Sequence, residues 1–427
     1  MSDPSFPALH IRPARGWLND PNGLCRIDGR YHVFFQHNPD SPVHGAICWG
    51  HVSSTDLLSW TEHPVALRPR PGELDAAGCW SGCVVDDGGV PTAVYTAVPD
   101  EPGNAVVALA RSDRTLVSWV PSSEPGPARP ADGSVEEVRD PFLFEFQGHR
   151  YAVQGAGSRS GPPQLLLYGC DDLRAWTPLG PLLDGDDPIA AAVAPAEIWE
   201  CPNLVQVDGC WVLLVSLWRW VGGTHQLSGV RYLLGDLVLT GDGLRFRVES
   251  GGVLDEGPAF YAPQTLVEAD RVLVWGWAWE LDRSGEQVEA AGWAGVLTYP
   301  RELLVQERKD GSRALASRPA RELTGLRSAV LTLEPGAGLR EPSFEVVASG
   351  PVRLSLRHGD TVAVVTELAG TRAEPARLLV DGSLVEAFAA GRCWTTRAYP
   401  TSRSQWLVEG DRDALAVHRL SGSGGRH

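Results

Sequence analysis

The sequence predicts an all-β protein, built as a five-bladed β-propeller followed by a C-terminal β-sandwich. Three observations favour this fold class. Short runs of Val, Leu, Tyr and Trp are separated by Asp-Gly and Gly-Pro turns, and long helical patterns are scarce. A hairpin-like unit recurs along the first 300 residues at intervals of about 60. Beyond residue 327, alternating apolar and polar residues indicate short antiparallel strands.

Five segments share a strand–turn–strand pattern with hairpin residues at the centre. Their turns lie at Asp28-Gly29, Gly88-Gly89, Gln147-Gly148, Asp208-Gly209 and near Ala269-Asp270. Several of them are followed by a turn that leads to an aromatic residue, which indicates an outer strand joining the next unit. These aromatic residues are Trp60, Trp119, Trp176 and Phe246. Five such units in a ring bury their faces and protect their edges. Unrelated consecutive hairpins in a sandwich are the alternative, against which the regular spacing argues.

The domain boundaries follow from changes in composition. The propeller is expected over residues 1–300, and the polar, charged stretch 301–326 is expected to be a linker. The sandwich is expected over residues 327–420, mainly as a support for the propeller. The final stretch 421–427, SGSGGRH, is expected to be disordered.

The composition excludes several classes of function. The formal charge of −16 opposes binding to nucleic acid or to an anionic membrane. Because no apolar run has the length of a signal peptide or a membrane span, a cytoplasmic location is expected, with the eight cysteines reduced. Cys79 and Cys83 have no second Cys/His pair at ligand spacing, so no metal site is expected. The oligomeric state is left open.

Three acidic residues stand at similar distances before their turns. Asp20, Asp140 and Glu200 precede the turns by 8, 7 and 8 residues, and a proline follows each acid closely. We therefore expect them at equivalent places on the innermost strands of three blades, meeting at one mouth of the central channel. Carboxylates brought together in this way resist joint ionisation, which indicates chemistry rather than turn capping.

Carboxyl groups facing each other across a funnel suit cleavage of a glycosidic bond. One group must be ionised and another protonated, and burial separates their pKa values. Arg139 can hold the neighbouring Asp140 ionised or bind sugar hydroxyls. A calcium or two-metal site is the competing use of clustered acids, but the flanking residues are Trp, Ser, Gln and Arg rather than further oxygen ligands.

Other side chains are candidates for contact with a sugar. Gln36 and Gln264 offer amides for pairs of hydroxyls. Indole faces for a sugar ring are offered by Trp49, Trp80, Trp275, Trp277 and Trp279, of which Trp49 and Trp80 adjoin Gly-rich turns. The histidines at positions 32, 37, 44, 51 and 63 show no consistent metal spacing, and most are interpreted as surface or strand-packing residues.

Nine motifs in order give the chain a specific resemblance. They are WLNDPNG, FFQHNP, WGHVSSTDLLSW, CWSG, RDP, ECPNL, FYAPQTL, GWAGVLTYPREL and DGSLVEAF. Together they resemble glycoside hydrolase family 32, the β-fructofuranosidases, over about residues 10 to 400. The resemblance implies a five-bladed propeller followed by a β-sandwich, and it requires no metal or organic cofactor.

The resemblance also implies roles for individual residues. Asp20 would be the nucleophile, Glu200 the general acid/base, and Asp140 would bind ring hydroxyls and stabilise the transition state. The residues implied to line the fructose subsite are Asn19, Gln36, Trp49, Ser81, Arg139 and Trp275, and Trp80 joins them as a pocket candidate. The implied reaction releases a terminal β-D-fructofuranosyl residue from sucrose or a short fructo-oligosaccharide with net retention.

Alternatives remain open at this stage. Within the same family the substrate could be sucrose 6-phosphate, levan or inulin, or the enzyme could transfer fructose. An inverting arabinan or xylan glycosidase on a similar propeller would use water in place of Asp20 and a wider gap between carboxyl groups. A non-catalytic sugar-binding protein would keep the pocket, but all three acids are present.

Overall fold

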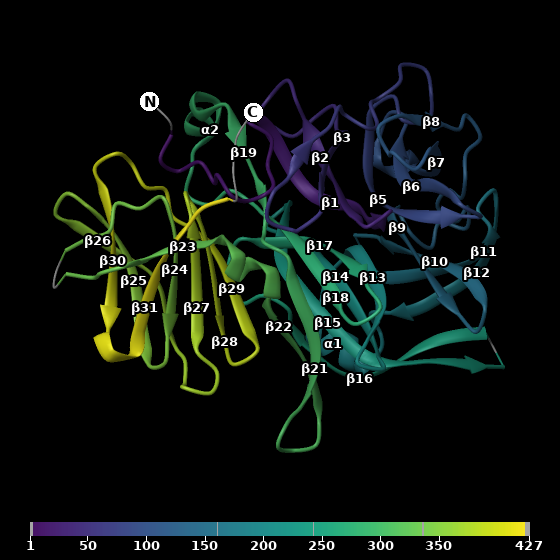
Figure 1. Cartoon of the computed structure of the whole chain (residues 1–427). Helices are drawn as coiled ribbons and strands as arrows, with labels where there is room; N and C mark the ends of the chain where they lie inside the picture. Colours follow the sequence, from purple (N-terminus) through teal and green to yellow (C-terminus); the bar gives the residue numbers. More distant parts are fainter. Residues whose placement is uncertain (1–2, 160, 242, 335–336, 423–427) are drawn as a thin grey trace.

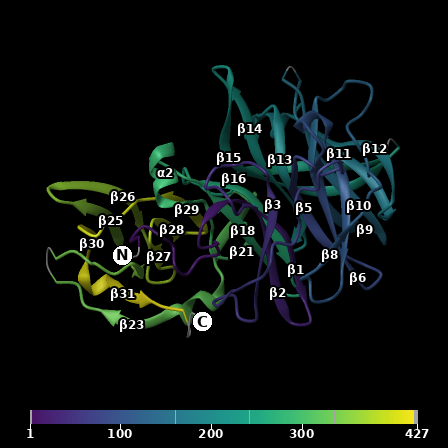
Figure 2. The ribbon, with the colours of Figure 1, turned by 90° about the horizontal axis from the view of Figure 1, so that it is seen from above.

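The computed structural model of the chain describes residues 3–159, 161–241, 243–334 and 337–422. It confirms an all-β fold made of a propeller and a sandwich that lie side by side (Figure 1). The view from above again places the sandwich to one side of the propeller (Figure 2). No helix in the described part of the chain is long and apolar enough to cross a membrane. Residues 423–427 of the tail that was expected to be disordered lie outside the described residues.

Each of the first two blades has four consecutive antiparallel strands, and the sheet of blade I gains a fifth, parallel strand from the end of the ring. Blade I contains β1 (Gly16–Ile27), β2 (Arg30–Asn38), β3 (Cys48–Ser54) and β4 (Thr61–Glu62). Blade II contains β5 (Gly78–Asp87), β6 (Val90–Val98), β7 (Val106–Ser112) and β8 (Trp119–Pro121), with the short 3₁₀ helix η1 (Pro102–Asn104) between β6 and β7.

The third and fourth blades are joined into one continuous sheet by a single bridge between β10 and β13. Blade III contains β9 (Glu137–Phe146), β10 (His149–Gly157), β11 (Gln164–Asp172) and β12 (Ala175–Asp184). Helix α1 (Pro188–Val193) then leads to blade IV, whose strands are β13 (Ile198–Val207), β14 (Cys210–Val221), β15 (Thr224–Thr240) and β16 (Gly243–Val253).

The turns explain why the inner hairpins form where the sequence places them. In four of the five predicted turns both central residues have positive φ, as at Asp28 (51°) with Gly29 (78°) and at Asp208 (48°) with Gly209 (76°). This geometry matches the twist of the flanking strands and favours Asp-Gly. The predicted aromatic residues also fall where expected, because Trp119, Trp176 and Phe246 lie on the outermost strands β8, β12 and β16.

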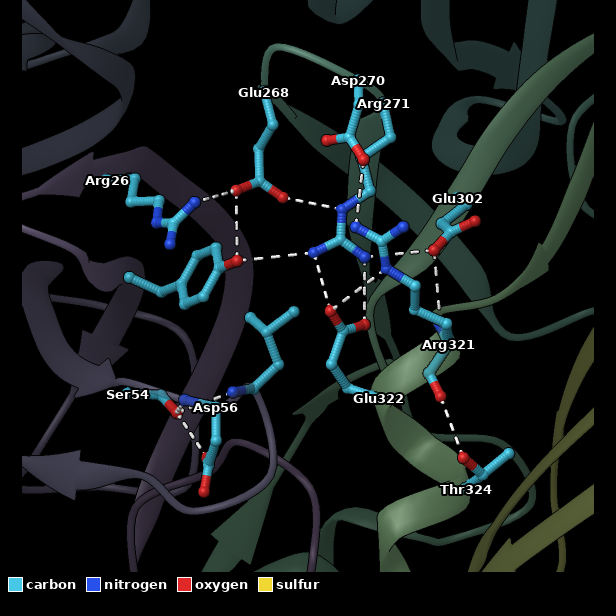
Figure 3. Close-up of polar contacts among 12 residues, drawn as sticks. Arg26, Ser54, Asp56, Glu268, Asp270, Arg271, Glu302, Arg321, Glu322 and Thr324 are labelled. Atoms are coloured by element: carbon cyan, nitrogen blue, oxygen red, sulfur yellow. Dashed lines mark hydrogen bonds and ion pairs between the residues drawn. The ribbon is translucent and has the colours of Figure 1, made fainter.

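Blade V corrects the predicted linker at 301–326. Its sheet runs β17 (Phe260–Val267), β18 (Val272–Ala278), β21 (Arg301–Glu307) and β22 (Arg313–Pro319), so much of the expected linker forms the two outer strands. The 3₁₀ helix η2 (Arg321–Leu326) follows. The charges that suggested a solvated connector are paired instead: Arg271 of β17–β18 binds Glu302 and Glu322 (Figure 3).

The ring closes where blade V meets blade I. The segment between β18 and β21 contains helix α2 (Gly285–Ala291) and the short strands β19 (Trp293–Ala294) and β20 (Val296–Leu297). β19 pairs in parallel with the start of β1, and β20 pairs with β18. At another point of the seam, Glu268 of blade V accepts a hydrogen bond from Arg26 (Figure 3). It accepts a second hydrogen bond from the Tyr31 hydroxyl.

The sandwich packs a six-stranded sheet against a three-stranded sheet. The larger sheet is ordered β23 (Arg327–Leu331), β31 (Leu415–Leu420), β24 (Ser343–Ala348), β27 (Ala376–Asp381), β28 (Leu384–Ala389) and β29 (Arg392–Arg397). The smaller sheet is ordered β26 (Thr361–Ala369), β25 (Pro351–His358) and β30 (Ser404–Gly410), and η3 (Arg412–Ala414) precedes β31. Their facing side chains form a separate apolar core that includes Phe344, Leu354 and Trp406.

Candidate active site

A β-bulge interrupts the innermost strand of every blade at the same place. The pairing with the next strand shifts between Leu18 and Pro21, and the same shift recurs in β5, β9, β13 and β17. The bulged pairs are Asn19-Asp20, Trp80-Ser81, Asp140-Pro141, Cys201-Pro202 and Ala262-Pro263. Bulges bend a strand and redirect its side chains, so each blade presents polar groups at the same end of the channel.

The three acids converge, but from different positions of this bulge. Glu200 is the last paired residue before its bulge, Asp140 is the first bulged residue and Asp20 is the second. The prediction that they occupy equivalent places was therefore wrong. Counting residues back from the turn failed for two reasons. A difference of one residue, between the distances of 7 and 8, already changes the position in the bulge, and β1 has a further register shift between Asn22 and Cys25.

Asp20 lies in a set of hydrogen-bond donors. Asn19 Nδ2 donates to its Oδ1 at 3.0 Å, while Gln36 Nε2 and the Ser81 hydroxyl donate to its Oδ2 at 3.1 and 2.7 Å. Burial raises the pKa of Asp20 to about 6, Glu200 adds to the rise, and the donors oppose it. Asp20 is therefore mainly ionised at neutral pH, and the donors fix its orientation.

Glu200 lies between residues at the equivalent positions of the two flanking blades. Arg139 Nε donates to Oε1 at 2.9 Å and the Tyr261 hydroxyl donates to Oε2 at 2.7 Å. Burial raises the pKa of Glu200, Arg139 opposes the rise, and the negative charge of Asp140 adds to it. Arg139 also pairs with Glu137, so its charge is shared between two carboxylates.

Asp140 accepts a backbone hydrogen bond and interacts electrostatically with both Asp20 and Glu200. The Cys201 amide donates to Asp140 Oδ2 at 2.9 Å, and Asp140 itself has a positive φ of 60°. Burial raises the pKa of Asp140 to about 6, and the nearby Asp20 adds to the rise while Arg139 opposes it. The Cys201 thiol lies 3.5 Å from Oδ2 of both Asp20 and Asp140, so these two oxygens are at most 7.0 Å apart.

These groups open into one cavity of about 450 Å³, which is large enough for a disaccharide. Asn19, Gln36, Trp80 and Arg139 line it with the three acids, and Ser81 lies directly behind Asp20. The structure thus brings these predicted site residues together in one place.

Two predicted tryptophans do not reach the cavity. Trp49 is fully buried between blades I and II, where its indole N–H donates to the backbone oxygen of Trp80 at 3.0 Å. Trp275 is fully buried in the propeller core. The proposed placement of these two in the fructose subsite was wrong, because their strand faces point into the core. Gln264 is also structural, since it bonds the backbone of Leu24 and Gly82.

The cavity wall contains aromatic residues that sequence reasoning did not assign to the site. They are Trp17, His44, Trp218, Trp220, His225 and Tyr261. Trp277, one of the five indoles that the sequence offered for contact with a sugar ring, also lines the cavity. Tyr261 stands in the quoted FYAPQTL motif, so its position beside Glu200 could have been found by aligning the five bulges. The other histidines behave as packing residues: His51 stacks between His32 and His63. No cluster of His, Cys, Asp and Glu suited to a metal ion occurs among the described residues.

Comparison with known proteins agrees with this geometry. The profile of the glycosyl hydrolases family 32 N-terminal domain matches residues 10–319. The chain belongs to glycoside hydrolase family 32. It is 33% identical to a raffinose invertase of Escherichia coli over 344 residues, which cover 77% of this chain and 68% of that protein. It is 34% identical to a sucrose-6-phosphate hydrolase of Klebsiella pneumoniae, covering 77% of this chain and 69% of the relative.

Solved structures of the family share the whole fold. A family 32 β-fructofuranosidase of Bombyx mori superposes with a TM-score of 0.78 at 26% identity, covering 98% of this chain and 94% of that chain. A variant of the same silkworm enzyme has been solved in complex with sucrose. The protein is therefore a family 32 glycoside hydrolase with a carbohydrate substrate, and the cavity at the propeller axis is its candidate active site.

Proposed function

We propose that the protein is a retaining β-fructofuranosidase that releases terminal β-D-fructofuranosyl residues from sucrose or short fructo-oligosaccharides. The observation that carries this proposal is the convergence of Asp20, Asp140 and Glu200 in one cavity, with different hydrogen-bond partners for each. The relatives named invertase and sucrose-6-phosphate hydrolase support a fructoside as the substrate.

Asp20 is suited to act as the nucleophile. Its anion is aligned by Asn19, Gln36 and Ser81 and bears no direct ion pair among the described contacts, so its charge is available to the anomeric carbon. Attack at C2 of the fructosyl unit forms a covalent fructosyl–enzyme ester and breaks the bond to the leaving oxygen. The donors that fix Asp20 keep the reacting oxygen in place without moving during the reaction.

Glu200 is suited to protonate the leaving oxygen and then to activate water. Burial and the charge of Asp140 raise its pKa and favour the protonated form needed in the first step. Once Asp20 is esterified its negative charge is gone, and Glu200 can take a proton from the incoming water. Asp140, held by the Cys201 amide, is placed to accept hydrogen bonds from ring hydroxyls while positive charge develops on the sugar.

Substitution of either acid tests this assignment. We expect Asp20→Asn and Glu200→Gln each to lower kcat for sucrose by at least about 10³-fold, since each removes a group that reacts directly. Asp28→Asn is the matched control, because Asp28 lies at the exposed turn of the same hairpin and its variant should keep activity. Retention of a tenth or more of the activity by either active-site variant would overturn the assignment.

A further inference from the structure

Aromatic residues form two walls of the cavity, one near Asp20 and one near Glu200. One wall lies beside Asp20: the Trp17 indole N–H donates to Asn19 Oδ1 at 2.7 Å, and the Trp17 ring contacts those of His44 and Trp277. The other wall lies beside Glu200: Arg139, which binds Glu200, has its guanidinium 5.3 Å from the centre of the Trp218 ring. The first wall is therefore linked to Asp20 through Asn19, and the second is linked to Glu200 through Arg139.

The geometry of the displacement indicates which wall lies on the side of the leaving group. In a displacement at the anomeric carbon, the nucleophile and the leaving group lie on opposite faces of the sugar. With Asp20 as the nucleophile and Glu200 as the proton donor, the leaving group extends toward the Glu200 side. The wall on that side is supplied by the hairpin of β14 and β15.

The register of this hairpin places its aromatic groups on one face. Trp218 pairs with Leu227 and Trp220 with His225, and side chains two residues apart on a strand share a face. His225 lies between the two indoles, with ring centres 4.7 Å from Trp218 and 4.3 Å from Trp220. Trp220 lines the cavity and is 37% exposed, so it is the more accessible of the two tryptophans.

The charges on this wall do not suit an anion. Arg139 is already bound to Glu137 and Glu200. Burial lowers the pKa of His225, which leaves its ring neutral at pH 7. Arg159 is the other cation of the cavity wall, and its guanidinium lies 4.7 Å over the Trp220 ring. A phosphate group here would meet one arginine and the Glu137 carboxylate, whereas phosphate sites gather several cations or backbone donors.

We propose that Trp218, Trp220 and His225 form the subsite for the leaving group, and that this subsite takes an uncharged sugar rather than a sugar phosphate. The inference rests on the proposed function and goes beyond it by naming the residues and the class of leaving group. Indole faces pack against the C–H surface of a pyranose without requiring a charge.

The test compares substrates that share the fructosyl unit and differ in the leaving group. The unmodified protein should have a kcat/KM for sucrose at least about tenfold above that for sucrose 6-phosphate. Trp220→Ala should lower kcat/KM for sucrose about tenfold, corresponding to one lost ring contact. Trp220→Ala should change kcat/KM for methyl β-D-fructofuranoside by less than about twofold, because the small methanol leaving group does not reach Trp220. Trp220→Phe, which keeps an aromatic face, should retain most of the activity on sucrose.

Trp394→Ala in the sandwich is the matched control. Trp394 is also partly exposed and also has an arginine over its ring, with Arg392 at 5.0 Å. Its variant should leave kcat/KM unchanged for both sucrose and methyl β-D-fructofuranoside. An equal loss on sucrose and on the methyl glycoside would overturn the assignment of the wall, and a tenfold preference for sucrose 6-phosphate would overturn the uncharged class. Both results leave the proposed β-fructofuranosidase activity intact and change only its leaving-group subsite or preferred leaving group, whereas absence of fructose release from every substrate would overturn that activity as well.

Discussion

At the scale of single residues, the three carboxyl groups of the candidate active site differ in their hydrogen-bond partners. Asp20 accepts hydrogen bonds from neutral donors, Asp140 accepts one from a backbone amide, and Glu200 is bound by Arg139 and Tyr261. All three are buried, and burial raises the pKa of each. The donors to Glu200 favour its carboxylate, whereas burial and the nearby charge of Asp140 raise its pKa and favour the protonated form that the proposed mechanism needs.

Tyr261 sets the upper limit of the active pH range. Its hydroxyl donates to Glu200 and favours the carboxylate, so Tyr261→Phe should raise the pKa of Glu200. In the proposed mechanism Glu200 must be protonated to assist the leaving group, so the alkaline limb of kcat/KM should move to higher pH by about 0.5–1 unit. The acid limb, where Asp20 and Asp140 ionise near pH 6, should stay in place. A pH profile of sucrose hydrolysis measures both limbs.

Tyr31→Phe is the control for this experiment. The Tyr31 hydroxyl also donates to a glutamate, Glu268, at the seam between blades I and V, outside the cavity. Its loss should leave both limbs unchanged. An unchanged or lower alkaline limb in Tyr261→Phe would contradict the position of Tyr261 as a donor to Glu200.

The sequence predicted the three clustered acids better than the cavity walls around them. Asp20, Asp140 and Glu200 stand in short contiguous motifs, which can be recognised from the sequence alone. Whether a tryptophan faces the core or the cavity depends on the face of its strand, and a bulge changes that face; Trp49 and Trp80 adjoin similar turns yet point in different directions. The wall formed by Trp218 and His225 requires the register of a long hairpin, which no local pattern supplies.

At the scale of elements, blade V shows how a charged sequence becomes an outer strand. Arg271 is buried at the turn between β17 and β18 and binds Glu268, Glu302 and Glu322 (Figure 3). The range 301–326 looked like a linker because its two partners of Arg271, Glu302 and Glu322, are 31 and 51 residues distant from it in sequence. Charge in a sequence therefore does not distinguish a solvated connector from a strand that completes an ion-pair network.

Loss of Arg271 should destabilise the propeller. Arg271→Met leaves the buried carboxylates of Glu268 and Glu302 without this cation, and we expect the free energy of unfolding to fall by about 3 kcal/mol. Arg321→Met is the control, because Arg321 pairs with Asp270 at the exposed surface and should change stability by less than about 1 kcal/mol. Denaturant unfolding measures both, and equal effects of the two variants would contradict a structural role for the Arg271 network.

At the scale of the whole molecule, buried charges join the propeller to the sandwich. Arg301 of β21 binds Glu386 of the sandwich at 2.6 Å and Asp255 of the propeller at 2.7 Å. The N-terminal segment lies along the same interface, where His10 contacts both Asp381 and Glu386. The motif DGSLVEAF contributes Asp381 and Glu386, so this motif supplies contacts that join the two domains.

Arg301→Met tests this coupling. The variant leaves Glu386 and Asp255 buried with no arginine between them, and the free energy of unfolding should fall by about 3–5 kcal/mol. The control Arg353→Met removes an ion pair with Glu367 that is half exposed on the sandwich, and its effect should stay below about 1 kcal/mol. If Arg301→Met melted only the sandwich and left propeller activity and stability unchanged, the two domains would be independent.

The central claim is that Asp20 and Glu200 act on opposite sides of a single fructose. It is tested most directly by sucrose cleavage in aqueous methanol, with the configuration of the transferred fructose read by NMR. Two successive inversions through an Asp20 ester predict methyl β-D-fructofuranoside, with the starting configuration retained. Formation of the α-anomer would show a single inversion without a covalent enzyme intermediate and would contradict the account.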